Sequence, residues 1–165
     1  MTISPTELSA FSRLIDDLSG IVIDDSKSYL VEHRLNTVLR EHNLPSYAEL
    51  YHRVRYDNDT TLTHAVIDAI TTNETLFFRD TTPYDALRNK VLPHLFDRFE
   101  GTPRLRIWSA ACSTGQEPYS IAMTLRNLVP DIDEWDVSIL GTDISDAAIG
   151  QASRGVYSEF EMQRG

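Results

Sequence analysis

The segment Arg106–Ser120 (RIWSAACSTGQEPYS) constrains the fold of this chain more than any other. It indicates a short apolar strand, a loop of small residues, and a helix that opens at Glu117–Pro118. Proline suits a first helical turn, because the N–H group that it lacks would have no partner within the helix there. Small loop residues let a ligand approach the backbone, and the N–H groups at the helix start face that ligand. The pattern therefore predicts the first half of a nucleotide-type site in an α/β sheet.

Residues 6–72 follow a different pattern, because their apolar side chains recur at helical spacing throughout. Four helices are expected there, and Gly20 ends the first of them, where a left-handed residue is favoured. The predicted starts are Ser4 or Thr6, Ser26 or Ser28, Ser46 in a capping box with Glu49, and about Asp59. This half of the chain predicts an all-α domain.

After Arg79 the pattern alternates between helices and strands. Pro93 is expected to kink or restart a helix that begins at Pro83, before a turn at Gly101–Pro103. The next elements expected are a strand at Leu105–Trp108, a helix at about Pro118–Leu128, a strand at Val137–Leu140 and a helix at about Ser145–Ala152. This order predicts a parallel sheet with right-handed crossovers. The expected fold class is α/β, with an all-α helical domain at 1–72, a junction at 73–80 and a partial sheet domain at 81–165.

Only two strands are expected before the chain ends at Gly165. A two-stranded parallel sheet is rarely viable alone, because both of its faces and both of its edges need cover. We therefore expect a fragment that needs its missing half or a second copy. Its open edge and apolar face predict self-association.

Charge and cysteine content limit the partners and the compartment. A formal charge of −10 over 165 residues argues against nonspecific nucleic-acid binding. Residues 26–56 nevertheless carry five Lys/Arg against three Asp/Glu, which suggests an acidic partner for that segment. Cys112 is the only cysteine, and the sequence starts without a signal peptide and contains no apolar run long enough to cross a bilayer. A cytoplasmic protein without membrane insertion is expected.

Several side chains have both a structural and a functional interpretation. Asp143 follows the second expected strand, where it would bind ribose hydroxyls or simply cap the next helix. Glu117 would interact with the helix dipole or hold a cationic ligand group. Cys112 is interpreted as a buried, inert thiol. Because the loop has the single glycine Gly115 instead of G-x-G-x-x-G, NAD binding is disfavoured.

Three motifs, in this order, resemble the CheR family, the chemotaxis-receptor glutamate O-methyltransferases that use S-adenosylmethionine. They are T-x-N-E-T-x-F-F-R at Thr71–Arg79, the full segment Arg106–Ser120, and G-T-D-I-S at Gly141–Ser145. The tail residues Gly155–Tyr157 and Arg164–Gly165 are also similar to the family. The resemblance covers the whole chain and implies the first half of a Rossmann-like S-adenosylmethionine-dependent methyltransferase sheet.

The resemblance also implies the reaction and the site. A methyl group would pass from S-adenosylmethionine to glutamate side chains of membrane chemoreceptors, which leaves S-adenosylhomocysteine. Asp143 would hold the ribose, and Glu117 the methionyl ammonium or a neighbouring hydroxyl. Arg79, the expected catalytic residue, would pair with the carboxylate of either the cofactor or the substrate. The family's cofactor contacts fall on Asn73, Thr75, Arg79, Glu117 and Asp143.

For partners, the resemblance implies that the basic helical domain docks on the acidic, cytoplasmic methylation helices of a chemoreceptor. The positions expected to make that contact are Lys27, Arg34, Arg40, Arg53 and Arg55. Full-length members continue through further strands, cofactor contacts and a small β-subdomain, which are not present here. The alternative is a non-catalytic docking or scaffold module with a vestigial half-site. A weaker alternative is a sensor whose basic helical domain binds an anionic ligand.

Overall fold

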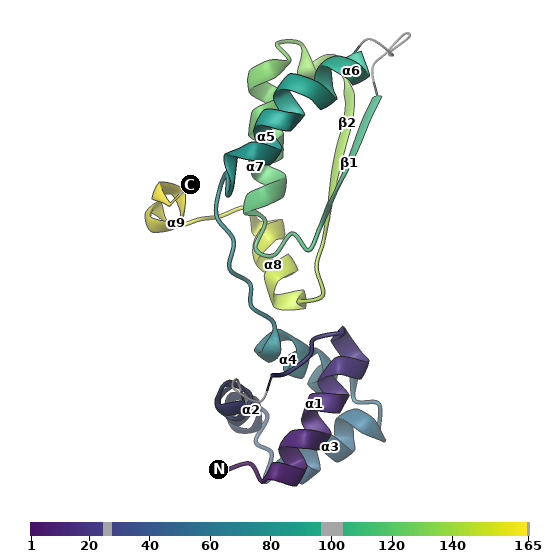
Figure 1. Ribbon diagram of the computed structural model, residues 1–165, viewed down its shortest axis with the longest axis vertical. Helices are drawn as coiled ribbons and strands as arrows, with labels where there is room; N and C mark the ends of the chain where they lie inside the picture. Colours follow the sequence, from purple (N-terminus) through teal and green to yellow (C-terminus); the bar gives the residue numbers. More distant parts are fainter. Residues whose placement is uncertain (25–27, 97–103, 165) are drawn as a thin grey trace. The chain divides into compact units, whose positions relative to one another are not determined.

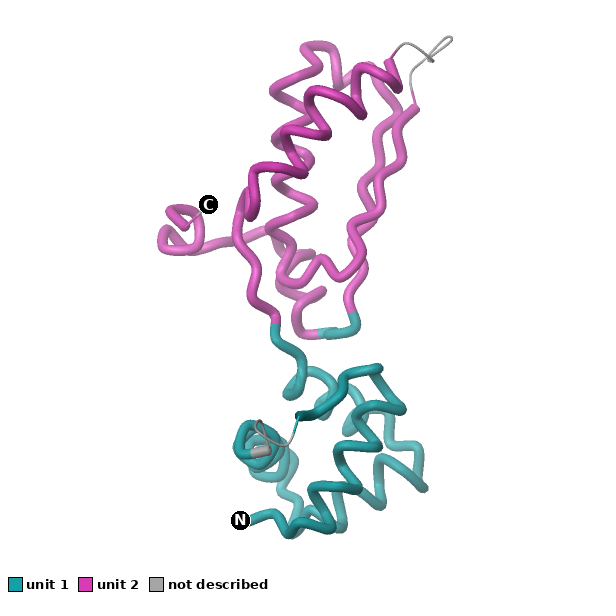
Figure 2. The backbone as a smooth tube through the Cα atoms, viewed as in Figure 1, with its two compact units in different colours: residues 1–72, 144–146 teal, residues 73–143, 147–165 magenta. Residues whose placement is uncertain are grey.

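The computed structural model describes residues 1–24, 28–96 and 104–164. They form two compact units, of which the first holds residues 1–72 with 144–146 and the second holds residues 73–143 with 147–165 (Figure 2). The expected turn at Gly101–Pro103 and the candidate residue Lys27 lie outside the described residues.

The first unit is built from the helices α1 (Pro5–Ser19), α2 (Ser28–Glu41), α3 (Tyr47–Arg55) and α4 (Thr60–Ile70). Ser4 caps α1 in a capping box with Glu7, and Gly20 ends it with a φ of 71°. The hydroxyl of Ser46 accepts a hydrogen bond from the N–H of Glu49 at the start of α3. These features confirm the predicted all-α character and decide for Ser4 over Thr6 as the first cap.

Apolar side chains from all four helices form the core of this unit. Phe11, Leu35, Leu50 and Val66 are fully buried, one from each helix. Each helix therefore contributes one apolar stripe, as the spacing predicts. In the part of the chain that the structure describes, no helix is both long and apolar enough to cross a membrane.

After residues 73–80, the second unit continues with one long helical segment, made of α5 (Thr81–Ala86), a π-helical turn (Leu87–Val91) and α6 (Leu92–Phe96). The N–H of Leu92 donates to the carbonyl of Leu87, five residues earlier. Pro93 follows directly, and its missing N–H interrupts the regular pattern. The expected change near Pro93 is therefore present, as a π-helical turn.

A parallel pair of strands forms the sheet of this unit. In chain order the elements are β1 (Arg104–Ala110), α7 (Gln116–Leu128), a 3₁₀ turn (Ile132–Glu134), β2 (Asp136–Thr142), α8 (Asp146–Arg154) and α9 (Glu159–Gln163). The register runs from Arg104 opposite Asp136 to Ala110 opposite Thr142. The parallel pairing confirms the predicted α/β class. The short helix α9 was not predicted, although Ser158 and Glu161 form the capping box that marks its start.

The helices α5, α6, α7 and α8 lie on one face of this sheet (Figure 1). Leu105 of β1 packs with Leu92 of α6 and Leu125 of α7 in the buried core. On the other face, Trp108 lies opposite Leu140 in the register, and their side chains are 69% and 60% exposed. The sheet therefore has one covered and one open face within the described residues.

Candidate functional site

The loop between β1 and α7, residues 111–115, has an unusual backbone. Ala111, Ser113 and Gly115 all have positive φ, of 58°, 51° and 99°. A positive φ is uncommon for residues other than glycine, and it persists only where the surrounding structure holds the residue in place. Such residues concentrate at functional sites. The loop therefore depends on contacts from other segments for its conformation.

Asp143, directly after β2, supplies one of these contacts. Its Oδ2 accepts a hydrogen bond of 2.8 Å from the N–H of Ser113. One residue earlier, the N–H of Cys112 donates to the carbonyl of Thr142 at 2.9 Å. Both bonds join the end of β2 to the loop that follows β1. The carboxylate of Asp143 is thus held at the carboxyl edge of the sheet, where α/β folds bind their ligands.

Glu117, in the first turn of α7, is oriented by the strand that precedes it. Its Oε1 accepts a hydrogen bond of 2.7 Å from the hydroxyl of Ser109, which is itself buried. A carboxylate here also interacts favourably with the dipole of the helix. The interaction of Glu117 with the helix dipole and its proposed contact with a cationic ligand group are therefore compatible. The Ser109 hydroxyl orients the same carboxylate that the start of α7 stabilises.

The junction segment that begins at Asn73 is bonded to the loop and to α7. The carbonyl of Asn73 accepts a hydrogen bond of 2.9 Å from the Ser113 hydroxyl. The N–H of Phe78 donates to the hydroxyl of Ser120, also at 2.9 Å. The guanidinium of Arg79 folds back onto the carbonyl of Glu74 at 2.9 Å. Ser113 thus binds two of the predicted site residues, Asn73 and Asp143.

Four of the five predicted cofactor residues line two separate pockets. Arg79 and Glu117 line a pocket of about 300 Å³ whose other walls include Tyr84, Leu87 and Ile121. Asn73 and Thr75 line a second pocket of about 270 Å³, together with Thr114, Gln116, Gln151 and Arg164. The structure therefore brings the residues together in pairs, with Asp143 at the loop, and not in one common pocket.

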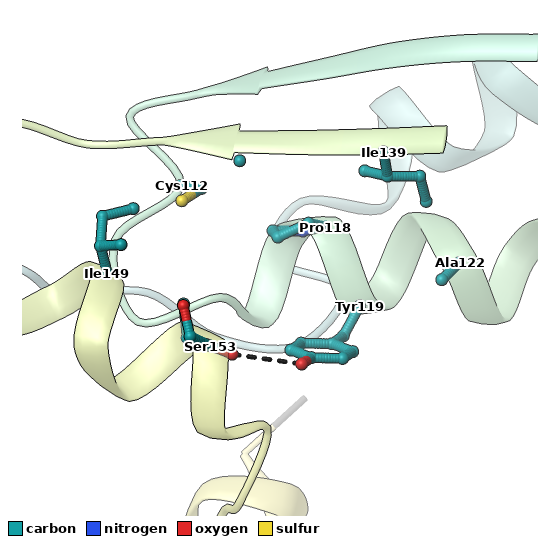
Figure 3. A pocket seen from close by; sticks show the side chains of 9 residues that line it. Cys112, Pro118, Tyr119, Ala122, Ile139, Ile149 and Ser153 are labelled. Carbon is teal, nitrogen blue, oxygen red and sulfur yellow. Dashed lines mark hydrogen bonds between the residues drawn. The ribbon is translucent and has the colours of Figure 1, made fainter. Parts of the chain in front are cut away.

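Cys112 lies in the loop but faces the interior of the unit. It is buried, and it lines an apolar pocket between β2, α7 and α8 together with Pro118 and Ile149 (Figure 3). Burial, followed by the charges of Asp143 and Glu117, raises the pKa of its thiol. A thiol with a raised pKa stays protonated and unreactive at neutral pH. This agrees with the interpretation of Cys112 as inert.

The basic residues predicted to bind a partner have contacts inside the helical unit. Arg34 donates to the carbonyls of Ile70 and Thr71 at the end of α4. Arg53 pairs with Asp59, and Arg55 lies 3.5 Å from the carboxylate of Asp17. Arg40 is exposed at the end of α2. Three of the five candidates therefore already have partners within the helical unit, and of these Arg55 lies in an exposed ion pair.

Four residues whose hydroxyl groups bond to segments of the candidate site were not among the predicted site residues, although Tyr157 belongs to the tail that resembles the family. They are Ser109, Ser113, Ser120 and Tyr157. The three serines lie inside the motif Arg106–Ser120, and each is a hydroxyl within an otherwise apolar or small stretch. A buried hydroxyl needs a partner, so this pattern was the available signal.

Comparison with known proteins identifies the family. Residues 6–71 match the all-alpha domain of the CheR methyltransferases, and residues 73–164 match the S-adenosylmethionine-binding domain of the same family. The chain belongs to the CheR methyltransferase family. The resemblance drawn from the three motifs is thereby confirmed.

Curated chemotaxis protein methyltransferases match over all or nearly all of the chain. The chemotaxis protein methyltransferase 1 of Pseudomonas aeruginosa is 39% identical over an alignment of 175 residue positions, gaps included. The alignment covers 100% of this chain and 61% of that protein. The chemotaxis protein methyltransferase of Vibrio parahaemolyticus is 41% identical over 172 residues, which cover 100% of this chain and 60% of the relative. The chemotaxis protein methyltransferase of Borreliella burgdorferi is 34% identical over 162 residues, which cover 96% of this chain and 57% of the relative. The chain thus spans about three fifths of the length of these relatives.

Proposed function

We propose that this chain is the cofactor-binding and receptor-docking part of an enzyme that methylates glutamate side chains of membrane chemoreceptors. The observation that carries the proposal is the pocket shared by Arg79 and Glu117. Its one cation, one carboxylate and apolar walls fit a zwitterionic amino-acid group, such as the methionyl end of S-adenosylmethionine. The cofactor's identity is supported by the family match of residues 73–164.

Each polar side chain has a distinct proposed role. Glu117, oriented by Ser109, would accept a hydrogen bond from the methionyl ammonium or a neighbouring hydroxyl. Asp143 would bind the ribose hydroxyls at the edge of the sheet. Arg79 would pair with a carboxylate, either that of the cofactor or that of the substrate glutamate. Asn73 and Thr75 would hold the cofactor from the junction segment.

The chemistry requires little beyond positioning. A glutamate side chain has a reference pKa of about 4.3, so it is already ionised at neutral pH and needs no general base. When bound, S-adenosylmethionine supplies an electrophilic methyl group. The protein's task is to align the carboxylate with that methyl and to exclude water. The pocket lined by Arg79 and Glu117 offers apolar walls that exclude water and a guanidinium that can pair with a carboxylate.

Receptor docking is proposed for the helical unit. Residues 26–56 are basic in an acidic chain, which favours contact with acidic receptor helices. Arg40 is the exposed position that carries this proposal best, since Arg34, Arg53 and Arg55 already make contacts within the helical unit. Receptor-fragment binding that is unchanged by Arg40→Glu would remove this residue from the interface.

Calorimetric titration with S-adenosylhomocysteine tests the cofactor site. We expect the chain to bind, and we expect Asp143→Asn to weaken binding by about tenfold or more, since hydrogen bonds to a charged group contribute about 1.5–3 kcal/mol. Asparagine keeps an oxygen that accepts from the N–H of Ser113, so the loop contact survives the substitution.

Asp133→Asn is the matched control, because it makes the same chemical change at an exposed carboxylate that pairs with Arg126. Its affinity for S-adenosylhomocysteine should equal that of the unsubstituted chain. If the folded chain does not bind at all, the non-catalytic docking or scaffold module becomes the better interpretation. Equal affinities of all three proteins would refute the ribose-binding role of Asp143.

A further inference from the structure

Tyr157, three residues beyond the end of α8, bonds to a loop 43 residues earlier in the chain. Its hydroxyl donates a hydrogen bond of 2.8 Å to the carbonyl of Thr114. That carbonyl shares a peptide plane with the N–H of Gly115, which in turn donates to the carbonyl of Cys112 at 3.0 Å. Because the peptide group is rigid, one bond from Tyr157 fixes the orientation of both groups.

The contact at Gly115 leaves no room for a side chain. A Cβ at this position would lie 2.6 Å from the Tyr157 hydroxyl and 2.9 Å from the Cβ of Ala152. The φ of 99° at the same residue also favours glycine. The tyrosine hydroxyl therefore occupies the space that glycine leaves open, directly at the start of α7.

The ring of Tyr157 joins two further segments of the candidate site. It packs edge-on against Phe77, with ring centroids 4.9 Å apart, and against Tyr119 of α7 at 5.8 Å. Phe77 is buried and lies between Thr75 and Arg79 in the junction segment. One side chain thus contacts the loop, the junction segment and α7, which together carry four of the five proposed cofactor residues.

The hydroxyl of Tyr157 keeps its proton under all ordinary conditions. Burial, with smaller contributions from Tyr119 and Glu161, raises the pKa of Tyr157 to about 12. The group is therefore a constant hydrogen-bond donor near neutral pH, suited to hold a carbonyl and unsuited to accept a proton from a substrate.

From these contacts we propose that Tyr157 is a positioning residue that holds residues 111–115 in the conformation that binds S-adenosylmethionine. The inference rests on the function proposed above. Tyr157 acts through the backbone of Thr114 and Gly115 and needs no contact with the reacting atoms.

Tyr119 provides a close control for this proposal. Its hydroxyl donates to the carbonyl of Ala152 near the end of α8 at 3.1 Å, a bond that Figure 3 shows. It therefore joins α7 to α8, and its hydroxyl bonds to α8 and not to the loop. Removal of either hydroxyl costs one hydrogen bond from a tyrosine to a backbone carbonyl.

The experiment compares Tyr157→Phe with Tyr119→Phe in the chain described here. Both variants keep the aromatic ring, and we expect similar small decreases in Tm. Only Tyr157→Phe should lower the affinity for S-adenosylhomocysteine, by about three- to tenfold, the equivalent of one hydrogen bond. Only Tyr157→Phe should also accelerate amide hydrogen exchange at Gly115, because the peptide plane before it is released.

Equal losses of affinity in the two variants, or unchanged exchange at Gly115 in Tyr157→Phe, would overturn the proposal. If the unsubstituted chain does not bind S-adenosylhomocysteine, the proposed function of this chain fails. The exchange rate at Gly115 then decides the role of Tyr157 by itself: selective acceleration in Tyr157→Phe supports loop positioning, and equal rates in both variants refute it.

Discussion

At the residue scale, hydroxyl groups organise the candidate site. The hydroxyl of Ser109 donates a hydrogen bond to Glu117, and Ser113 bonds to both Asn73 and Asp143. The hydroxyl of Ser120 accepts a hydrogen bond from the N–H of Phe78 in the junction segment. Ser109 and Ser120 are buried at 2% and 0% exposure, so their hydrogen-bonding groups need partners inside the protein. The charged residues that carry the proposed chemistry thus depend on neutral neighbours for their orientation.

Ser120→Ala tests this dependence. The Ser120 hydroxyl donates to the carbonyl of Gln116 and accepts from the N–H of Phe78, so alanine leaves that N–H without its partner. We expect the free energy of unfolding to fall by about 1–3 kcal/mol. Urea denaturation followed by tryptophan fluorescence reports on this unit, because both tryptophans, Trp108 and Trp135, lie in it.

Thr124→Val serves as the comparison for that measurement. Thr124 is also buried on α7, and its hydroxyl also donates to a carbonyl four residues earlier, here that of Ser120. It supports only its own helix, so we expect a smaller loss, below about 1 kcal/mol. A loss for Ser120→Ala no larger than that for Thr124→Val would contradict the proposed anchoring of Phe78.

At the element scale, a helix cap fixes the connection between two helices of the first unit. Asp59 caps α4 through a hydrogen bond of 3.1 Å from the N–H of Leu62, and it also pairs with Arg53 of α3. The N–H of Leu62, and then the guanidinium of Arg53, hold the pKa of Asp59 below its ordinary value of 3.8. One carboxylate thereby joins the end of α3 to the start of α4.

A pH dependence follows from the lowered pKa of Asp59. A depressed folded-state pKa stabilises the fold above the unfolded-state pKa, and this contribution disappears as the pH falls through the folded-state value. We expect the unsubstituted chain to have a higher Tm than Asp59→Asn at neutral pH, by a difference that vanishes well below pH 3.8. Thermal unfolding followed by circular dichroism measures this; a difference that persists in acid would show that charge is not its cause.

At the scale of the whole molecule, the open face of the sheet exposes large apolar side chains of the second unit. Trp108 and Leu140 lie opposite each other there, flanked at one end by the ion pair between Arg106 and Asp136. Parallel sheets are almost always covered on both faces. The matched relatives are longer than this chain, which spans about three fifths of their length.

We expect the chain to self-associate through this face. The mean molar mass from sedimentation should rise with protein concentration, and Leu140→Lys should suppress the increase, because a charge disfavours burial of the face. Val22→Lys, at an apolar position in the other unit that is 78% exposed, should have no effect. A monomer at every concentration would refute the expectation.

The sequence by itself determined the elements and the family. Helical spacing, caps such as Ser4 and Ser46, and the strand–loop–helix segment Arg106–Ser120 all act over a few residues, so they can be recognised without tertiary structure. The three motifs identified the CheR family because they are long and ordered. The boundaries of most helices and strands were consequently predicted to within a few residues.

The tertiary structure alone decided which residues contact one another. The bond from Tyr157 to Thr114 spans 43 residues, that from Ser120 to Phe78 spans 42, and Arg34 reaches the carbonyl of Thr71 across 37. Local periodicity carries no information about pairs so far apart, because chain folding brings them together. For that reason the sequence could name candidate residues, whereas only the folded chain shows their division between two pockets and the hydroxyl groups that hold them.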